Sequence, residues 1–474
     1  MTAVDQANIV APSLVEGRPG LDKLLRCGVT VLDQAIVSGT RFATSVLVAR
    51  YAGAQELGTY TLALSIFMIL ASIEHALVSG PYAVFSHRHE KEQKRRLAGS
   101  VVLHLTGLML LIAFICGLVA AGTGAAALFL GSEFAGLSEF SWLCLLLGIC
   151  LPLLLARSFA RSFTLAHFDH AGVTYLDVVA DGLILGGLLL LIGGGLLTGE
   201  TALIAIGAGG AAASVVWFFR YRRELVFEMS AVKTDLHRHL RFGKWVVAAE
   251  ILGTAQGYLV LWLLAGTRSV TETGIYAACL AIANLLNPVL IGLASYFTPH
   301  LARTFAAHGT GLLRRRSYLA TGAMCAVVFA FLLFISLFGE ETMRFVMADD
   351  IYSGQQSTLI LLTLGLLFGS VGFGAETSLW IREQNRLSFI ASAIAFTVTL
   401  TTGVYLVTEF GVAGAAAATL LGRAVFAVVS IGFDVHHTKR ASAGRARSSE
   451  LPGVAADRSS LPTSGSSLPP EEQR

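Results

Sequence analysis

Long apolar runs alternate with short polar segments along most of this sequence. A helix needs about 20 apolar residues to cross a bilayer. The segments that are long enough are 28–49, 58–82, 99–120, 140–158, 171–194, 201–219, 244–265, 273–296, 317–338, 356–377, 387–408 and 412–434. The end of the third is open, because residues 125–130 are also apolar and could extend the helix or form an interfacial segment. We therefore expect an all-α polytopic membrane protein with about 12 transmembrane helices.

The stretch 24–81 occurs a second time, in a fainter form, from Leu240 onward. Each copy holds two apolar runs joined by a short turn, and a basic loop follows it. The clearest matches, all at one offset, are Gly58-x-Tyr60 with Gly274-x-Tyr276, Leu64 with Leu280 and Ile66 with Ile282. Internal repeats are typical of transporters, whose sites lie where two repeats meet. Six helices in each half would make both halves begin on the same side, which predicts two six-helix lobes related by an axis along the membrane normal.

This division predicts five segments. They are a disordered cytoplasmic tail (1–24), a first lobe (25–219), a cytoplasmic link (220–243), a second lobe (244–434) and a disordered cytoplasmic tail (435–474). The last is rich in Ser, Pro, Gly and Arg and could not form a core. The first lacks the apolar core and cleavage site of a signal peptide.

Charge supports this arrangement. Only 14% of the residues are charged and 54% are hydrophobic, whereas a soluble domain has about 25% charged residues. With the N-terminus inside, 29 of the 34 Lys and Arg residues fall in inside segments, and three fall in outside loops. Such an excess is the positive-inside signal. It predicts a multi-pass protein of the cell inner membrane with both termini in the cytoplasm.

Several kinds of chemistry find no support in the sequence. The six cysteines fall in or beside apolar runs without a C-x-x-C pair, so we expect small core residues and neither disulfides nor zinc ligands. No P-loop is present, which argues against ATP as the direct energy source. We expect no cofactor, no metal and no nucleic-acid partner, and a proton or Na⁺ gradient as the possible driving force.

Polar side chains form a stripe along the first apolar helix. Gln34, Ser38, Arg41 and Ser45 recur at helical spacing, with Asp33 at the edge. Buried polar groups in a membrane protein usually face a cavity. The stripe therefore predicts a cavity wall in which the Arg41 fork binds phosphate oxygens. Alternatively, Arg41 only pairs with a carboxylate and holds two helices together.

A second stripe lies on the fifth helix. Thr174, Asp177 and Asp181 share one face, and two carboxylates at this spacing in a low dielectric should not both ionise easily. This favours a proton or Na⁺ coupling site, to which Asp33 could also belong. The alternative is that Asp177 lies near the cytoplasmic surface and is simply hydrated.

Other polar residues interrupt the apolar runs. Glu74 and His75 could titrate near neutral pH, or one of them could only bond a neighbouring helix, which is the interpretation we favour. The remaining candidates all lie in the second half: Glu250 as a further coupling carboxylate, and Gln256, Asn284, Asn287 and Arg423 as cavity residues. Asn287-Pro288 should also kink its helix, because proline removes a backbone hydrogen bond.

The run Gly39-x-x-Phe42 to Val46-Leu47-x-Ala49-Arg50-Tyr51-x-Gly53 and then Leu57-Gly58-x-Tyr60 resembles the start of polysaccharide transporters. These are the Wzx-type oligosaccharide flippases of the multidrug/oligosaccharidyl-lipid/polysaccharide (MOP) exporter superfamily. Thr273-Gly274-Ile275-Tyr276-Ala277-Ala278 and Gly411-x-x-Gly414-Ala415-Ala416 are similar to second-half signatures of that family. The resemblance spans about residues 22–435.

The resemblance implies a MATE-like fold of two lobes around a cavity that opens alternately to each side. It also implies that an undecaprenyl-diphosphate-linked oligosaccharide moves from the inner to the outer leaflet, with a polysaccharide polymerase and export machinery as possible partners. The drug-exporting branch has acidic residues on its first and fifth helices, where Asp33, Asp177 and Asp181 fall here.

Two other functions stay open at this stage. One is a cation-coupled exporter of amphipathic small molecules, which an aromatic and Met-lined cavity would favour. The other is a membrane glycan polymerase or ligase, which needs a long outside loop with catalytic groups, and no such loop is visible. Two buried arginines favour an anionic headgroup over an amphipathic cation as the substrate. Without a long outside loop, we expect a transporter and not an enzyme.

Overall fold

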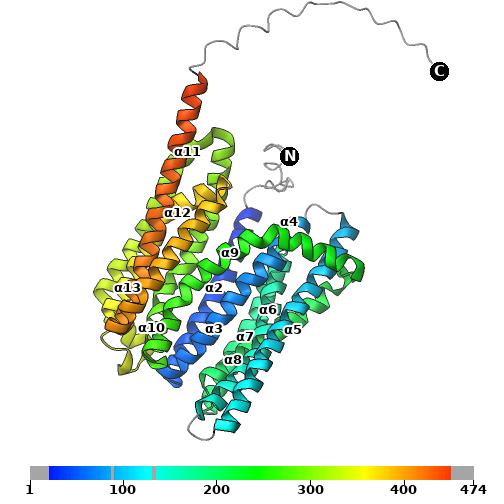
Figure 1. Ribbon diagram of the computed structural model, residues 1–474, viewed down its shortest axis with the longest axis vertical. Helices are drawn as coiled ribbons and strands as arrows, with labels where there is room; N and C mark the ends of the chain where they lie inside the picture. The colour runs from blue at the N-terminus through cyan, green and yellow to red at the C-terminus, as the bar shows by residue number, and fades with distance from the viewer. Residues whose placement is uncertain (1–20, 87–89, 131–134, 450–474) are drawn as a thin grey trace, which may run out of the picture.

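The computed structural model describes residues 21–86, 90–130 and 135–449, and these form a bundle of long helices (Figure 1). The first half contains α2 (Leu21–Tyr51), α3 (Ala54–Glu74), the π-helical turn η1 (His75–Ser79), α4 (Gly80–Ser86), α5 (Lys91–Leu130), α6 (Ala135–Ala166), α7 (His170–Gly193) and α8 (Gly199–Tyr221). After the 3₁₀ turn η3 (Arg222–Glu224), the second half contains α9 (Met229–Thr267), α10 (Val270–Ala283), η4 (Asn284–Leu286), α11 (Asn287–Met347), η5 (Asp350–Tyr352), α12 (Gln356–Ile381) and α13 (Asn385–Ser449).

Eight continuous helical stretches of the described chain are long and apolar enough to cross a membrane. Two of these stretches, of 78 and 53 residues, are too long for one crossing. Each reverses at a glycine with positive φ, Gly309 (φ 71°) in α11 and Gly411 (φ 54°) in α13. A side chain at such a position would be strained, so these glycines divide each stretch into two crossings. The predicted all-α polytopic architecture is therefore confirmed.

The helices extend beyond several predicted ends. Residues 125–130 continue α5, so they extend the third helix and form no separate segment. The fourth predicted span ended at residue 158, but α6 continues to Ala166. Arg157, at the end of the predicted span, and Arg161, beyond it, therefore both lie within α6. Their charges are neutralised inside the bundle, which is why the helix can continue past them.

The predicted tails and link also contain helix. α2 begins at Leu21, inside the predicted tail 1–24, and α9 begins at Met229, inside the predicted link 220–243. Residues 435–449 are the last turns of α13, so the prediction of disorder from residue 435 was wrong for this part. Ala and Arg are good helix formers, and no proline occurs between residues 435 and 451. Residues 1–20 and 450–474 lie outside the described residues.

The helices pack as two lobes. In the first lobe α2 packs against α7, α5 against α6, and α8 against both α6 and α7, while in the second α12 packs against α11 and α13 and α9 against α13. We call the side where α2 begins and α13 ends the tail side, and the opposite side, with the turn after α2 and the segment around η5, the loop side (Figure 1). The link that leads into α9 lies on the tail side.

The two copies of the repeat meet on the loop side, where α3 crosses α10. A Cβ atom built on Gly58 would lie 2.1 Å from the carbonyl oxygen of Val270. One built on Gly274 would lie 1.7 Å from the carbonyl oxygen of Ala54. The two contacts correspond under the internal repeat, so the crossing has approximate twofold symmetry. Only glycine allows the two backbones to approach this closely.

Two further contacts close the loop side. The Arg50 side chain, at the end of α2, donates Nε–H to the Val346 carbonyl oxygen at 2.6 Å and also donates to Phe345. The Tyr352 hydroxyl donates to the Ala49 carbonyl oxygen at 3.3 Å. The carbonyls at the end of α11 carry the negative end of the helix dipole, which favours a guanidinium there. The lobes are thus held together on this side by the backbone as well as by side chains.

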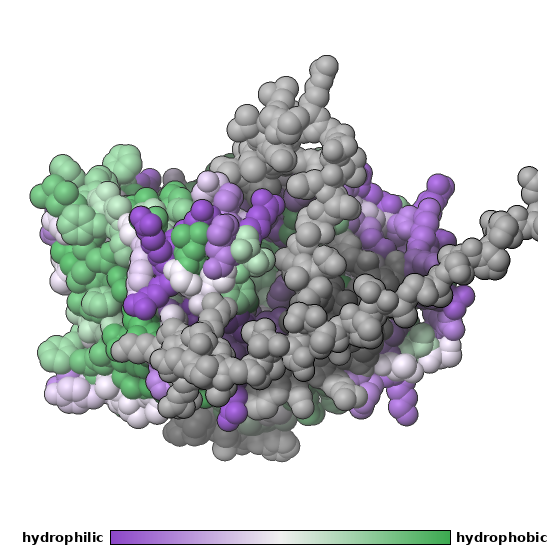
Figure 2. All heavy atoms as spheres, turned by 90° about the horizontal axis from the view of Figure 1, so that it is seen from above, coloured by the Kyte–Doolittle hydropathy of each residue, from purple (hydrophilic) through white to green (hydrophobic). Residues whose placement is uncertain are grey.

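The outer flanks are apolar. Seen along the bundle, hydrophobic side chains cover one flank, while hydrophilic ones gather toward the middle and the opposite edge of the view (Figure 2). On α5, Leu110, Phe114 and Leu118 recur every four residues and are each more than 60% exposed. An apolar face of this kind is what a helix presents to lipid.

Candidate functional site: a cavity in the second lobe

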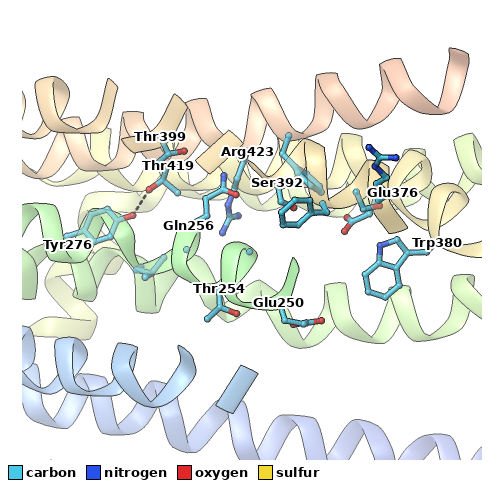
Figure 3. Close-up of a pocket in the computed structure, with 18 residues that line it drawn as sticks. Glu250, Thr254, Gln256, Tyr276, Glu376, Trp380, Ser392, Thr399, Thr419 and Arg423 are labelled. Carbon is cyan, nitrogen blue, oxygen red and sulfur yellow. Dashed lines mark hydrogen bonds between the residues drawn. The ribbon is translucent and has the colours of Figure 1, made fainter. Parts of the chain in front are cut away.

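A cavity of about 1180 Å³ lies among α9, α10, α12 and α13 (Figure 3). Its wall combines hydroxyl, amide, aromatic and charged side chains with exposed glycine backbone. The lining residues are Glu250, Gly253, Thr254, Gln256, Gly257, Tyr276, Leu280, Gly369, Glu376, Trp380, Arg386, Ser388, Phe389, Ser392, Thr399, Thr419, Arg423 and Phe426. All of them belong to the second half of the chain.

Polar side chains line the loop-side end of this cavity, and one of them, Arg423, is positively charged. Arg423 projects from α13 into it, and its electrostatic neighbour is the Tyr276 hydroxyl. That hydroxyl shares a hydrogen bond of 2.8 Å with Thr419 (Figure 3). Within residues 21–86, 90–130 and 135–449, no carboxylate forms an ion pair with Arg423. The guanidinium donors are therefore directed to the cavity and could receive an anion.

The tail-side end holds charges of both signs and most of the aromatic rings. Glu250 of α9 and Glu376 of α12 are electrostatic neighbours across it. Trp380 lies one turn after Glu376 on α12 (Figure 3), and Arg386, in the first turn of α13, also lines the cavity. Such a lining could bind sugar hydroxyls and stack a sugar ring, or it could bind an organic cation.

The structure brings only some of the predicted cavity residues together. Gln256 and Arg423 line this cavity, as does Glu250, which the sequence suggested for coupling. Asn284 and Asn287 are not in its wall and bond to each other at 3.1 Å. The 3₁₀ turn η4 interrupts the helix just before Pro288, where a kink was predicted. This cavity lies within the second lobe, whereas the sequence suggested a site between the lobes.

The stripe on the first helix lies elsewhere. Gln34, Ser38, Arg41 and Ser45 are not in the wall of the second-lobe cavity. The electrostatic neighbours of Arg41 are Tyr60, Tyr258, Arg157, Arg161 and Asp181, and the described carboxylates make no ion pair with it. The Ser45 hydroxyl donates to the Arg41 carbonyl oxygen at 3.1 Å.

The internal repeat relates the surroundings of the two arginines. Tyr60 and Tyr276 are equivalent in the repeat, both are fully buried, and each is an electrostatic neighbour of a membrane arginine, Arg41 or Arg423. The neighbours of Arg41 and of Arg423 do not overlap. The two guanidiniums thus occupy comparable places in separate lobes.

The predicted coupling carboxylates of the first lobe belong to a buried ion-pair cluster. Arg157 contacts Asp181 at 2.6 Å and Asp177 at 3.1 Å. Arg161 contacts Asp177 at 2.9 Å and also pairs with Asp33. The three aspartates are each nearly buried, so the interpretation of Asp177 as a hydrated surface group does not hold.

Sequence reasoning missed four of these charged residues. Arg157 and Arg161 were counted only among the positive charges of the inside segments, although their spacing of four matches that of Asp177 and Asp181. Glu376 and Arg386 were not considered. A signal for Glu376 exists, because it is a carboxylate at the end of an otherwise apolar predicted span.

Glu74 lies apart from both charge groups. Its side chain is fully buried, and the Ser79 hydroxyl donates to its Oε1. Glu74 directly precedes η1, the π-helical turn between α3 and α4, and Ser79 is the last residue of that turn.

No family model matches the chain, and no curated protein matches it. Among solved structures, an inward-facing MATE multidrug transporter of the MOP superfamily is similar, with TM-score 0.71, 14% identity, and 86% of this chain and 95% of that chain covered. The lipid II flippase MurJ in an inward closed conformation has TM-score 0.65 and 15% identity, with 87% of each chain covered. An outward-facing MATE transporter has TM-score 0.59 and 14% identity, covering 88% and 95%. The chain therefore has the fold shared by these MATE transporters and the MurJ flippase.

Proposed function

We propose that the protein is a flippase that moves a lipid-linked oligosaccharide across the membrane by alternating access. The observation that carries this proposal is Arg423, a guanidinium on the wall of a large cavity with no described carboxylate partner. A buried cation in a membrane protein needs an anion, and the diphosphate of a polyprenyl-linked sugar would supply one. The Wzx-type branch of the MOP exporters, which the sequence resembles, is the finer assignment within this proposal.

The rest of the cavity suits a glycan. Its volume of about 1180 Å³ exceeds the usual 300–1,000 Å³ of small-molecule sites, so several sugar rings would fit. Threonine and serine hydroxyls and the Gln256 amide offer hydrogen bonds, and Trp380 offers a ring face. The polyprenyl tail would stay in the bilayer beside the apolar flanks. A polysaccharide polymerase and export machinery would act on the product in the outer leaflet.

The arrangement of the lobes fits an alternating mechanism. On the loop side the lobes are closed by the Gly58–Gly274 crossing and by Arg50. A substrate would therefore enter from the tail side, which the Lys and Arg distribution assigns to the cytoplasm. If the lobes then separated on the loop side and closed on the tail side, the substrate would be released on the other face of the membrane. A proton or Na⁺ gradient would drive this cycle.

A second function has its own supporting observation. Glu250 and Glu376 line the tail-side end of the same cavity, close to Trp380, Phe389 and Phe426. Two carboxylates beside aromatic rings suit an amphipathic cation. A cation-coupled exporter of such molecules is the alternative.

Two ligands distinguish the functions. Purified protein would be titrated with a fluorescent undecaprenyl-diphosphate sugar and with a lipophilic cationic dye. The flippase proposal predicts saturable binding of the diphosphate that weakens at least tenfold in Arg423→Ala and less in Glu250→Gln. Binding of the dye alone, lost in a Glu250→Gln/Glu376→Gln variant and kept in Arg423→Ala, would establish the exporter.

A further inference from the structure

A buried carboxylate lies near the contact between the lobes without a basic partner among the described residues. Glu74 has no exposed surface. Its Oε1 accepts a hydrogen bond from Ser79, while its Oε2 has no hydrogen-bond partner in the described structure. An isolated ionised carboxylate is strongly disfavoured in such a place, and the group takes up a proton instead.

The backbone beside Glu74 is irregular for an identifiable reason. Pro81 has no N–H and cannot donate to the carbonyl four residues earlier, and the chain forms the π-helical turn η1 just before it. In a π-helix residue i lies beside residue i+5, which is the spacing between Glu74 and Ser79. The hydrogen bond between them therefore depends on the π register.

The surroundings of Glu74 offer no compensating charge. The elements packed against η1 are α3, α4, α5, α6 and α9. The titratable or charged side chains that these elements and η1 place on this half of the bundle, within the described side chains, are His75, Tyr82, Lys91, Glu92, Lys94, Arg95, Arg96, His104, Arg157, Arg161, Lys233, Asp235, His237, His239 and Glu250. None of them is an electrostatic neighbour of Glu74, whose environment is set by burial and by Ser79.

Glu74 is also mechanically close to the substrate cavity. Two residues before it, Ser72 of α3 shares a hydrogen bond of 2.6 Å with Thr254 of α9. Thr254 lines the cavity, and η1 itself packs against α9. A change at η1 can therefore reach the α3–α9 contact between the lobes. The aspartates of the first lobe differ, because Arg157 or Arg161 contacts each of them.

We propose that Glu74 is a proton-binding site that couples lobe movement to the proton gradient. In the conformation described here, Glu74 is a neutral acid. When α3 separates from α9, water reaches the side chain, the acid releases its proton to that water and the carboxylate forms. Uptake of one proton restores the neutral acid and allows the contact to close. This inference rests on the proposed transport function, because it names the group that would link it to an ion gradient.

The first test is infrared difference spectroscopy of the purified protein in lipid between mildly acid and mildly alkaline pH. The parent should show the carbonyl band of a protonated carboxylic acid that disappears on ionisation. Glu74→Gln should lose this band. Glu409→Gln, which changes an exposed glutamate, should keep it, and Ser79→Ala should displace its pH midpoint. A band that persists in Glu74→Gln would overturn the proposal and point to the Asp33, Asp177 and Asp181 cluster.

The second test measures lobe movement without any substrate. Spin labels at Phe168 and Glu383, exposed turn residues of the first and second lobes, would report the tail-side distance in a chain whose native cysteines are replaced. The parent and Glu409→Gln should change their distance distribution with pH, while Glu74→Gln should keep the acid distribution at both values. A parent that does not respond to pH, or a Glu74→Gln variant that responds like the parent, would overturn the proposal. Either result leaves the flippase proposal to its own binding test.

Discussion

Gly58 of α3 and Gly274 of α10 pack backbone against backbone, each beside the residue that begins the other's helix. The internal repeat makes the two positions equivalent, so the contact joins one lobe to its own copy. Because it lies on the loop side, the proposed flippase would have to open this contact to release a substrate there.

Gly58→Val should force the α3–α10 crossing apart, because the new Cβ would overlap the Val270 carbonyl oxygen. Overpacking of this kind typically costs about 1–3 kcal/mol. We expect a lower melting temperature in lipid and increased labelling of the loop side by a membrane-impermeant reagent. Gly107→Val is the matched control, since no atom lies within 4 Å of a Cβ placed at Gly107. Equal melting temperatures for the two variants would contradict this role of the crossing.

Arg50→Ala should weaken closure of the loop side, because the carbonyls of Phe345 and Val346 lose their cross-lobe donor. The distance between spin labels placed on the loop-side turns of the two lobes should shift toward longer values. Arg344→Ala is the control, because Arg344 is exposed and pairs only within α11 in the described structure. If the two variants give the same distances as the parent, Arg50 does not hold the lobes together.

Arg161→Ala should destabilise the first lobe, because Asp33 and Asp177 would lose a buried counter-charge. Breaking a buried ion pair from one side costs roughly 3–5 kcal/mol. Adding Asp33→Asn should restore part of the lost stability, since it removes one of the uncompensated carboxylates. The measurement is thermal unfolding in lipid nanodiscs. No recovery in the double variant would show that Arg161 acts through packing and not through its charge.

Asp169, in the turn before α7, should make stability depend on acid pH. Burial alone would raise the pKa of this carboxyl, but hydrogen bonds from Tyr221, Arg220 and the Gly172 amide outweigh it and lower the pKa. A lowered folded-state pKa stabilises the fold above the unfolded value of about 3.9 and loses this effect as pH falls through the folded value. Asp169→Asn, which keeps a capping side chain, should flatten the fall in melting temperature below about pH 4. Asp350→Asn, at an exposed position, should leave the slope unchanged.

The sequence predicted the helices well, because length and hydropathy alone decide whether a segment can cross a bilayer. It also identified the repeat whose glycines form the crossing. It could not give the symmetric contact, since the spacing of Gly58 and Tyr60 does not reveal which helix they face. The reversals at Gly309 and Gly411 were expected only as gaps between apolar runs.

The charged groups were harder to place. Arg157 and Arg161 ended a predicted helix because an unpaired cation belongs at a membrane surface, and only the fold shows the aspartates that neutralise them. Arg41 and Arg423 were both expected to line a cavity for an anionic headgroup, but which residues share one cavity is a tertiary property that no local pattern contains. Glu376 and Glu250 line the same cavity from two different helices, and this too depends on how the helices pack.

The most direct test of the central claim is flipping by the purified protein in liposomes. A fluorescent undecaprenyl-diphosphate sugar in one leaflet would be quenched from outside with time, under an imposed proton gradient. The parent should increase the flipping rate well above that of empty liposomes. Arg423→Ala should reduce it to background, Arg423→Lys should retain part of it, and Arg303→Ala, at an exposed position, should behave as the parent. Full activity of Arg423→Ala, or no flipping by the parent, would contradict the account.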